Sequence, residues 1–118
     1  MSIIYYHYTS RQFAQYIHCS GKLDSPTGIN WISPDFFQSG AEAAQALAIT
    51  RKSVEVACVI GDYAVHLALQ GPVPSPTPVL GITDPLTGVL ARKGGGNEIV
   101  INVPISLNPL QFVNLVSP

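Results

Sequence analysis

The helix signals of this chain fall within its first fifty residues, whereas strand signals dominate the remainder. Ser10 is a favourable N-cap for a short helix over residues 11–19, and Gly21 is placed to end that helix in a left-handed turn. Helices that come first and strands that follow are typical of an α+β domain rather than of alternating parallel units. This order of signals limits the fold more than any single motif does.

The second helix and the strands can be placed from the same kinds of signal. Ser39 and Glu42 have the spacing of a capping box, and an alanine-rich helix should follow to about Thr50. The segment 54–60 is β-branched and apolar apart from Glu55, which favours a strand at the centre of a sheet. β-branched, aromatic or alternating apolar residues also predict strands over residues 2–9, 31–33, 62–69, 79–82, 89–91, 98–103 and 112–116.

Length and composition favour one domain with a modest core. The chain has 118 residues, of which 47% are hydrophobic and only 11% charged, so it is not a disordered segment. We expect a single α+β domain over residues 1–118, with two short N-terminal helices packed on a mostly antiparallel sheet. The low charge also suggests that part of the surface is covered by a partner.

Charge and hydropathy exclude several classes of function. The net charge is −1 and no basic cluster exceeds two residues, so an extended contact with a phosphate backbone is disfavoured. The apolar runs are too short to span a bilayer, and the N-terminus lacks the pattern of a signal peptide. We expect a protein without a membrane segment that acts in the cytoplasm.

The two cysteines, Cys19 and Cys58, do not have the spacing of a metal site. We expect both to be small core residues in a reducing compartment, and we expect no metal cofactor.

Glu98 is the only ionisable side chain from Gly94 to the C-terminus, and it opens an apolar strand after three consecutive glycines. Alternation places Glu98 on the face opposite Ile99 and Ile101, which should point to the core. A carboxylate without a nearby cation is costly to bury, and glycines allow another chain or a ligand to approach closely. The segment therefore suits a catalytic acid, base or charge stabiliser. The alternative is an edge-strand glutamate that points into solvent and opposes aggregation.

His7 and Thr9 share a face of the first predicted strand, among tyrosines. A histidine ring can hold a ribose hydroxyl, and a neighbouring tyrosine such as Tyr8 can stack on a flat ring. The alternative for His7 is a buried imidazole bonded to a backbone carbonyl. Trp31 is the only tryptophan, and its alternative role is that of a core aromatic residue.

Three segments together resemble the small ADP-ribosyltransferase toxins of bacteria, whose signature includes a histidine at the end of the first strand. The first is the run Tyr6-His7-Tyr8-Thr9-Ser10. The second is Ile17 followed by Ser20-Gly21-Lys22-Leu23, and the third is Trp31-Ile32-Ser33-Pro34-Asp35. The strand that begins at Glu98 resembles the strand that carries the family's catalytic glutamate. The resemblance covers about a third of the chain and implies a split, mostly antiparallel sheet.

The resemblance also implies roles for individual residues. His7 would hold the ribose on the nicotinamide side, and Tyr8 and Thr9 would help to bind NAD. Trp31 would stand near the nicotinamide, Ser33 would support the pocket, and Arg51 would meet the pyrophosphate. Glu98 would bind the ribose hydroxyl and stabilise the oxocarbenium-like state. For Arg51 the alternative is a solvated residue that follows the second helix.

Two departures from the family pattern bear on the acceptor of the ADP-ribose. Gly96 stands two residues before Glu98, where family members that modify arginine or bases have glutamine or glutamate. Trp31 stands where tyrosine is usual.

The function that the resemblance implies is mono-ADP-ribosyl transfer from NAD, as substrate, to a macromolecular target, either a protein or a nucleic acid. NAD hydrolysis at the same site is one alternative. A non-catalytic binding or immunity module with the same fold is another. A toxin of this kind would have a cognate antitoxin or immunity protein as a partner.

Overall fold

The computed structural model describes residues 3–50, 52–88, 90–107 and 110–116. The helices of this part of the chain are α1 (Arg11–Ser20), α2 (Gly40–Ala46) and α3 (Asp62–Leu69). The strands are β1 (Ile4–Thr9), β2 (Lys22–Leu23), β3 (Asn30–Ile32), β4 (Val56–Gly61), β5 (Thr77–Pro78), β6 (Ile82–Thr83), β7 (Leu90–Arg92), β8 (Asn97–Ile101), β9 (Ile105–Ser106) and β10 (Gln111–Asn114).

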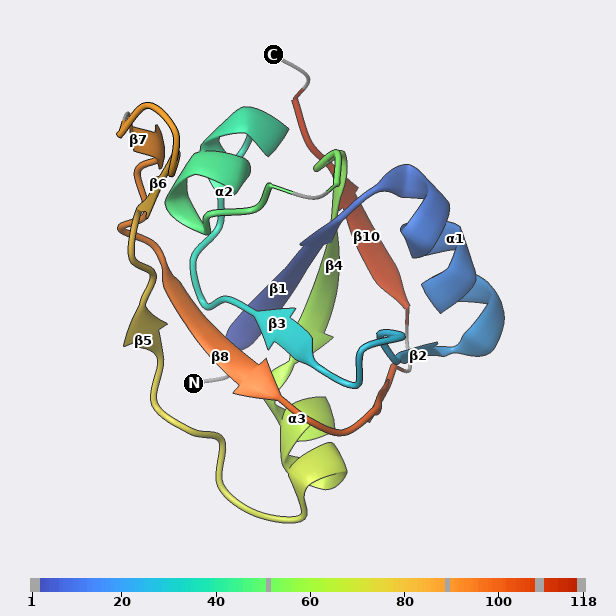
Figure 1. Cartoon of the computed structure of the whole chain (residues 1–118). Helices are drawn as coiled ribbons and strands as arrows, with labels where there is room; N and C mark the ends of the chain where they lie inside the picture. The colour runs from blue at the N-terminus through green and yellow to red at the C-terminus, as the bar shows by residue number, and fades with distance from the viewer. Residues whose placement is uncertain (1–2, 51, 89, 108–109, 117–118) are drawn as a thin grey trace.

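Two three-stranded antiparallel sheets form the body of the α+β domain (Figure 1). The first has the order β1-β4-β10, and the second has the order β3-β8-β5. The two sheets meet at an isolated bridge, in which Tyr6 and Ser33 exchange both backbone hydrogen bonds at 2.8 and 2.9 Å. The sheet is therefore split, and the junction between its halves lies beside His7.

The first sheet separates two clusters of core residues. Tyr5 and Ile17 pack with Cys58 on one face, and Tyr8 and Ala43 pack with their neighbours on the other. Helices α1 and α2 consequently cover opposite faces of this sheet, as Figure 1 shows. The alternation of side chains along β1 accounts for this division, since Tyr5 and Tyr8 lie on opposite faces of the strand. The prediction that both cysteines belong to the core is wrong for Cys19, which is exposed.

The first two helices begin where their caps predict. The Ser10 hydroxyl accepts a hydrogen bond from the Phe13 amide at 3.2 Å, and Gly21 ends α1 with a φ of 75°. The Ser39 hydroxyl accepts from the Glu42 amide at 3.0 Å. Each cap satisfies an amide that has no partner inside its own helix.

Helix α2 ends earlier than the sequence predicts, at Ala46 instead of about Thr50. The carbonyls of Gln45 and Ala46 accept from the amides of Gly94 and Gly96, at 2.8 and 3.0 Å. In a longer helix those carbonyls would bond to residues four positions further on. Tertiary contacts with the glycine segment thus replace the last turn.

The prediction of only two helices is wrong, because a third helix, α3, occupies the segment for which alternation favours a strand. Val65 is buried, and Ala64, Ala68 and Leu69 pack against the same core cluster. In contrast, Tyr63 and Leu67, which the alternating pattern would bury, are 74% and 60% exposed. The helical spacing of the inner residues therefore decides the structure.

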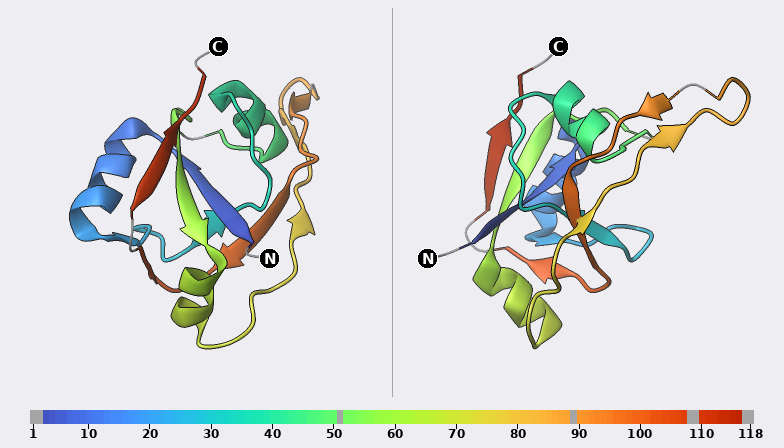
Figure 2. Two further views of the ribbon diagram at one scale, coloured as in Figure 1. Left: turned by 180° about the vertical axis from the view of Figure 1, so that it is seen from behind. Right: turned by 90° about the vertical axis from the view of Figure 1, so that its left-hand side faces the viewer.

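The β6–β7 hairpin projects from the body of the molecule (Figure 2, right). In it the segments near residues 82 and 91, both predicted as strands, pair with an irregular register. No helix in the described part of the chain is long and apolar enough to cross a membrane.

Candidate functional site

A pocket of about 680 Å³ lies where the two sheets meet. Its wall comes from β1, β3 and β8, from the segment that follows α2, and from the β5–β6 region. The wall is mostly apolar with a few polar groups, and both this composition and the volume are typical of small-molecule sites. The predicted site residues that line it are His7, Tyr8, Trp31, Ser33 and Glu98. Thr9 does not line it, and Arg51 lies outside the described residues.

The His7 imidazole is fixed in one tautomer by the backbone of β3. Its Nδ1 lies 2.7 Å from the Trp31 carbonyl oxygen, which can only accept, so Nδ1 carries the proton. Burial, together with the positive charge of Lys52, lowers the pKa of His7 to about 4, so the ring is neutral near pH 7. His7 is therefore a buried histidine bonded to a backbone carbonyl, as the alternative interpretation proposed. It also lines the pocket.

Two buried polar atoms of β1 have no hydrogen-bond partner among the described residues: His7 Nε2 and Thr9 Oγ1. Since Nδ1 carries the proton, His7 Nε2 is left with an unshared lone pair that can accept a hydrogen bond. Orphaned buried polar atoms are rare and costly in folded proteins. Both atoms belong to the His-x-Thr element, on one face of the strand. A ligand hydroxyl that reached this atom, which is closed to solvent in the structure, would satisfy the lone pair of His7.

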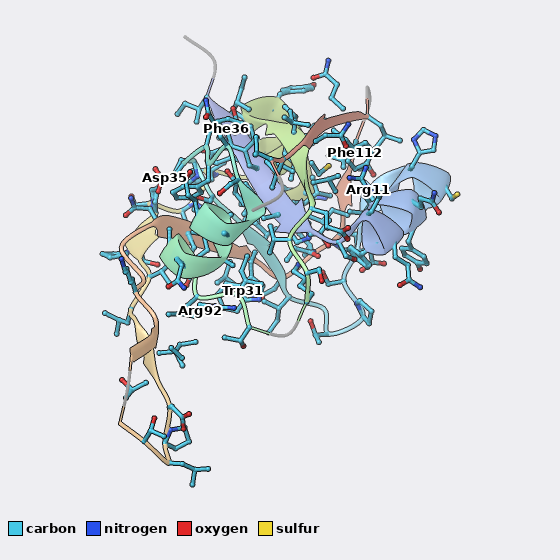
Figure 3. All side chains as sticks on the ribbon, turned by 90° about the horizontal axis from the view of Figure 1, so that it is seen from above. Arg11, Trp31, Asp35, Phe36, Arg92 and Phe112 are labelled. Atoms are coloured by element: carbon cyan, nitrogen blue, oxygen red, sulfur yellow. The ribbon has the colours of Figure 1, made fainter. Side chains whose placement is uncertain are left out.

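Trp31, labelled in Figure 3, lines the pocket and is partly exposed. It is 48% exposed and pairs across the strands with Val100, which is also exposed. The interpretation of Trp31 as a core aromatic residue is therefore wrong. Its ring offers a flat apolar surface on which a heteroaromatic ring can stack.

Glu98 lies in the middle strand of the second sheet and is not an edge residue. Its backbone pairs with Thr77 of β5, while the following residues pair with β3. Burial raises the pKa of its carboxyl group. Among the described residues, none bonds to the carboxylate or forms an ion pair with it. The interpretation as an edge-strand residue is therefore wrong, but Glu98 is only partly buried and lines the pocket without an ionic partner among the described residues.

The hydroxyls of Tyr8 and Ser33 are already engaged within the protein. Tyr8 Oη donates to the Asp35 carbonyl at 2.7 Å and accepts from the Phe37 amide at 2.9 Å. Ser33 Oγ donates to the Asn97 carbonyl at 2.6 Å and accepts from the Asp35 amide at 3.0 Å. Both residues line the pocket, but the chemistry of their hydroxyls is structural.

The glycine run before Glu98 is packed and does not form the open loop that its composition predicts. The amide of Gly95 donates to the Val79 carbonyl at 2.9 Å, and the Val79 amide donates to the Gly96 carbonyl at 2.8 Å. A Cβ on Gly94 would lie 2.5 Å from the Val79 carbonyl oxygen. The glycines therefore serve the close approach of three backbone segments behind the pocket.

Sequence reasoning missed Lys52 as a pocket residue. Lys52 lines the pocket, and its charge acts on His7. No carboxylate among the described residues forms an ion pair with it. Burial lowers its pKa to about 8, although the residue as a whole is exposed. We therefore attribute the shift to a partly dehydrated amine rather than to full burial. Its position in the basic pair after the second helix was the available signal.

The pocket thus joins a buried neutral histidine, an aromatic residue, a lysine and a glutamate. In the described ranges, no group of three histidine, cysteine or acidic residues is placed to hold a metal ion. Comparisons of the chain with protein-family models, curated proteins and solved structures gave no match.

Proposed function

We propose that this pocket binds NAD and that the protein is a mono-ADP-ribosyltransferase, which cleaves the nicotinamide–ribose bond and transfers ADP-ribose to a macromolecule. The observation that carries the proposal is the presence, in one pocket, of His7 and Glu98. Neither His7 Nε2 nor the Glu98 carboxylate has a partner among the described residues.

Each polar group of the pocket matches a part of NAD. His7 Nε2 can accept a hydrogen bond from a ribose hydroxyl, and Trp31 offers a surface for the nicotinamide ring. Lys52 carries the charge that a pyrophosphate requires, without a competing ion pair among the described residues. These assignments extend the roles that the resemblance implies, with Lys52 added.

The proposed chemistry places Glu98 beside the bond that breaks. The electron pair of the bond from ribose C1 to the nicotinamide nitrogen leaves with the nicotinamide, which neutralises its ring. Positive charge then develops on the ribose, and a carboxylate has the sign that stabilises it. A nucleophile of the acceptor attacks C1 and loses its proton, which completes the transfer. Attack by water would give hydrolysis.

The acceptor and the partners follow from charge and composition. Lys52 is the only cation among the described residues that line the pocket, so we expect a protein acceptor in preference to duplex DNA. Gly96, in place of glutamine or glutamate, favours hydrolysis as the second candidate reaction. A cognate immunity or antitoxin protein, and action in the cytoplasm, belong to the same proposal.

The test measures nicotinamide release by the purified protein, with Glu98→Gln and Glu98→Ala as variants. We expect release to fall by about 10²- to 10³-fold in both variants, because a preorganised electrostatic group is lost. Glu42→Gln is the matched control, since Glu42 is exposed on α2 and does not line the pocket. A cell extract with labelled NAD distinguishes transfer, which labels a macromolecule, from hydrolysis.

NAD binding can be followed separately through Trp31, which is the only tryptophan of the chain. Absence of nicotinamide release, together with an NAD titration that changes neither the Trp31 fluorescence nor the melting temperature, would refute the proposal. That result would favour the non-catalytic binding module.

A further inference from the structure

The first residues of β8 are held on the β3 side by side chains instead of by a backbone ladder. The antiparallel register of the two strands ends at the pair formed by Ile32 and Ile99. At Ser33 the backbone leaves β8 and exchanges its hydrogen bonds with Tyr6 of β1. Pro34 follows and has no amide to donate. The ladder therefore stops immediately before it would reach Glu98.

Two side chains replace the missing ladder at Asn97. Asp35 Oδ2 accepts from the Asn97 backbone amide at 2.8 Å and from its side-chain Nδ2 at 3.2 Å. Ser33 Oγ donates to the Asn97 carbonyl at 2.6 Å. Both backbone polar groups of Asn97 are thereby bonded to the chain that follows β3. We call Ser33, Asp35 and Asn97 the β8 clamp.

The clamp is itself fixed from within the protein. The Asp35 amide donates to Ser33 Oγ at 3.0 Å, and Tyr8 Oη donates to the Asp35 carbonyl at 2.7 Å. Tyr8 is buried in the second core cluster, so Asp35 is tied to the first sheet. Hydrogen bonds to an ionised carboxylate are about twice as strong as neutral ones.

The opposite side of β8 has only a short strand as its neighbour at this point. Its neighbour β5 has two residues, Thr77 and Pro78, and both are exposed. Thr77 Oγ1 donates to the Glu98 carbonyl at 3.3 Å, near the limit of a hydrogen bond. The Glu98 backbone is thus held from one side by Asn97 and from the other by Ile99, which is in the β3 ladder.

We infer that Asp35 is a positioning residue for Glu98, which acts through Asn97 and does not touch the substrate. The inference rests on the proposed function, since it assigns Glu98 as the reactive carboxylate. Asp35 is not among the residues that line the pocket, so its removal should spare the binding surface. A displacement of about 1 Å at a reacting group can reduce a rate by roughly 10²-fold.

The first experiment compares Asp35→Ala with Asp84→Ala. Asp84 accepts a hydrogen bond from a backbone amide, that of Leu86, at 2.8 Å, but it lies in the β6–β7 hairpin and away from β8. We expect Asp35→Ala to lower kcat for nicotinamide release by about 10- to 100-fold. The NAD affinity, read from Trp31 fluorescence, should change by less than about twofold, and Asp84→Ala should leave both quantities unchanged. An unchanged kcat in Asp35→Ala, or an equal loss of affinity, overturns the inference.

A charge exchange provides a rescue that a merely structural role would not predict. Asn97→Asp alone places two carboxylates in contact and should reduce kcat at least as far as Asp35→Ala. The double variant Asp35→Asn with Asn97→Asp restores an amide facing a carboxylate and should recover most of the lost turnover. The double variant also tests the clamp if Asp35→Ala fails to fold. A double variant no better than Asn97→Asp argues against the clamp.

Hydrogen exchange separates failure of this inference from failure of the proposed function. If the wild type does not cleave NAD, the proposed function fails, while the clamp can still be measured. The Asn97 amide should then exchange at least about 10-fold faster in Asp35→Ala, which removes the acceptor, than in the wild type, with no such change in Asp84→Ala. Equal exchange in all three proteins contradicts the clamp itself.

Discussion

The two sheets that meet at the pocket are held together in different ways. In the first sheet, β1 pairs with β4 over six consecutive residue pairs. In the second, β8 shares three pairs with β3 and two with β5, and side chains complete its start. His7 belongs to the continuous ladder and Glu98 to the side-chain-supported strand. Under the proposed function, we expect NAD binding to depend on the first sheet and the reaction to depend on how well the second is positioned.

Burial shifts the pKa values of His7 and Glu98 in opposite directions, and only the His7 side chain has a hydrogen-bond partner in the described part of the chain. It lowers the pKa of His7, whose neutral ring is satisfied at Nδ1 by the Trp31 carbonyl. It raises the pKa of Glu98, whose carboxylate has no partner among the described residues. The positively charged nicotinamide ring of NAD would favour the ionised carboxylate. The unpaired carboxylate of Glu98 is thus a charge that a cationic substrate could compensate.

The largest expected effect is a loss of folding stability at acid pH, caused by His7 of the first sheet. The pKa of His7 is about 4 in the folded protein and near 6.5 when unfolded, so the unfolded chain takes up a proton first as the pH falls. The contribution of His7 to stability is therefore complete above about pH 6.5 and is lost toward about pH 4, by roughly 3 kcal/mol. Urea unfolding of the wild type and of His7→Asn between these pH values measures it. Parallel curves for the two proteins would show that His7 is not the buried titrating group.

The next effect concerns the glycine segment behind the second sheet. Gly94 and Gly88 both have a φ of 72°, but only at Gly94 would a Cβ meet backbone atoms. Both substitutions by alanine should cost about 1 kcal/mol for the left-handed conformation. Gly94→Ala should cost roughly a further 1–2 kcal/mol. Equal melting temperatures for the two variants would mean that the segment is loosely packed, and the contrast between the sheets would weaken.

The smallest effect separates the two nitrogens of His7. The amide nitrogen of asparagine can replace Nδ1 as the donor to the Trp31 carbonyl, but it leaves no acceptor at the position of Nε2. We expect His7→Asn to bind NAD about 10-fold more weakly than the wild type at pH 7.5 with a loss of stability below about 1 kcal/mol. His7→Gln should show the reverse pattern, with the larger loss in stability. Identical affinities for both variants would remove His7 Nε2 from the binding site.

Local signals predicted the parts of the fold that local chemistry decides. Ser10, Gly21 and the Ser39–Glu42 pair mark helix ends in the sequence because each satisfies or terminates its own turn. Ile99 and Ile101 could be assigned to the core because strand side chains alternate. The same rule failed for Tyr63 and Leu67, because a short apolar segment can match both the helical and the strand periodicity.

The parts that sequence reasoning missed depend on contacts between distant segments. The end of α2 is decided by Gly94 and Gly96, some fifty residues later in the chain. Asp35 follows a proline and has no periodic context, so nothing nearby in the sequence connects it with Asn97. Lys52 could be connected with the site only through the tertiary structure, in which the segment after α2 lines the pocket.

The sequence by itself determined which residues share a strand face and where the first two helices begin, because those features follow from neighbours a few positions apart. Only the tertiary structure decided that His7 and Glu98 line one pocket, because their strands are ninety residues apart and belong to different sheets. The bridge between Tyr6 and Ser33 brings those sheets together. Such pairing depends on packing across the whole chain, which no short segment encodes.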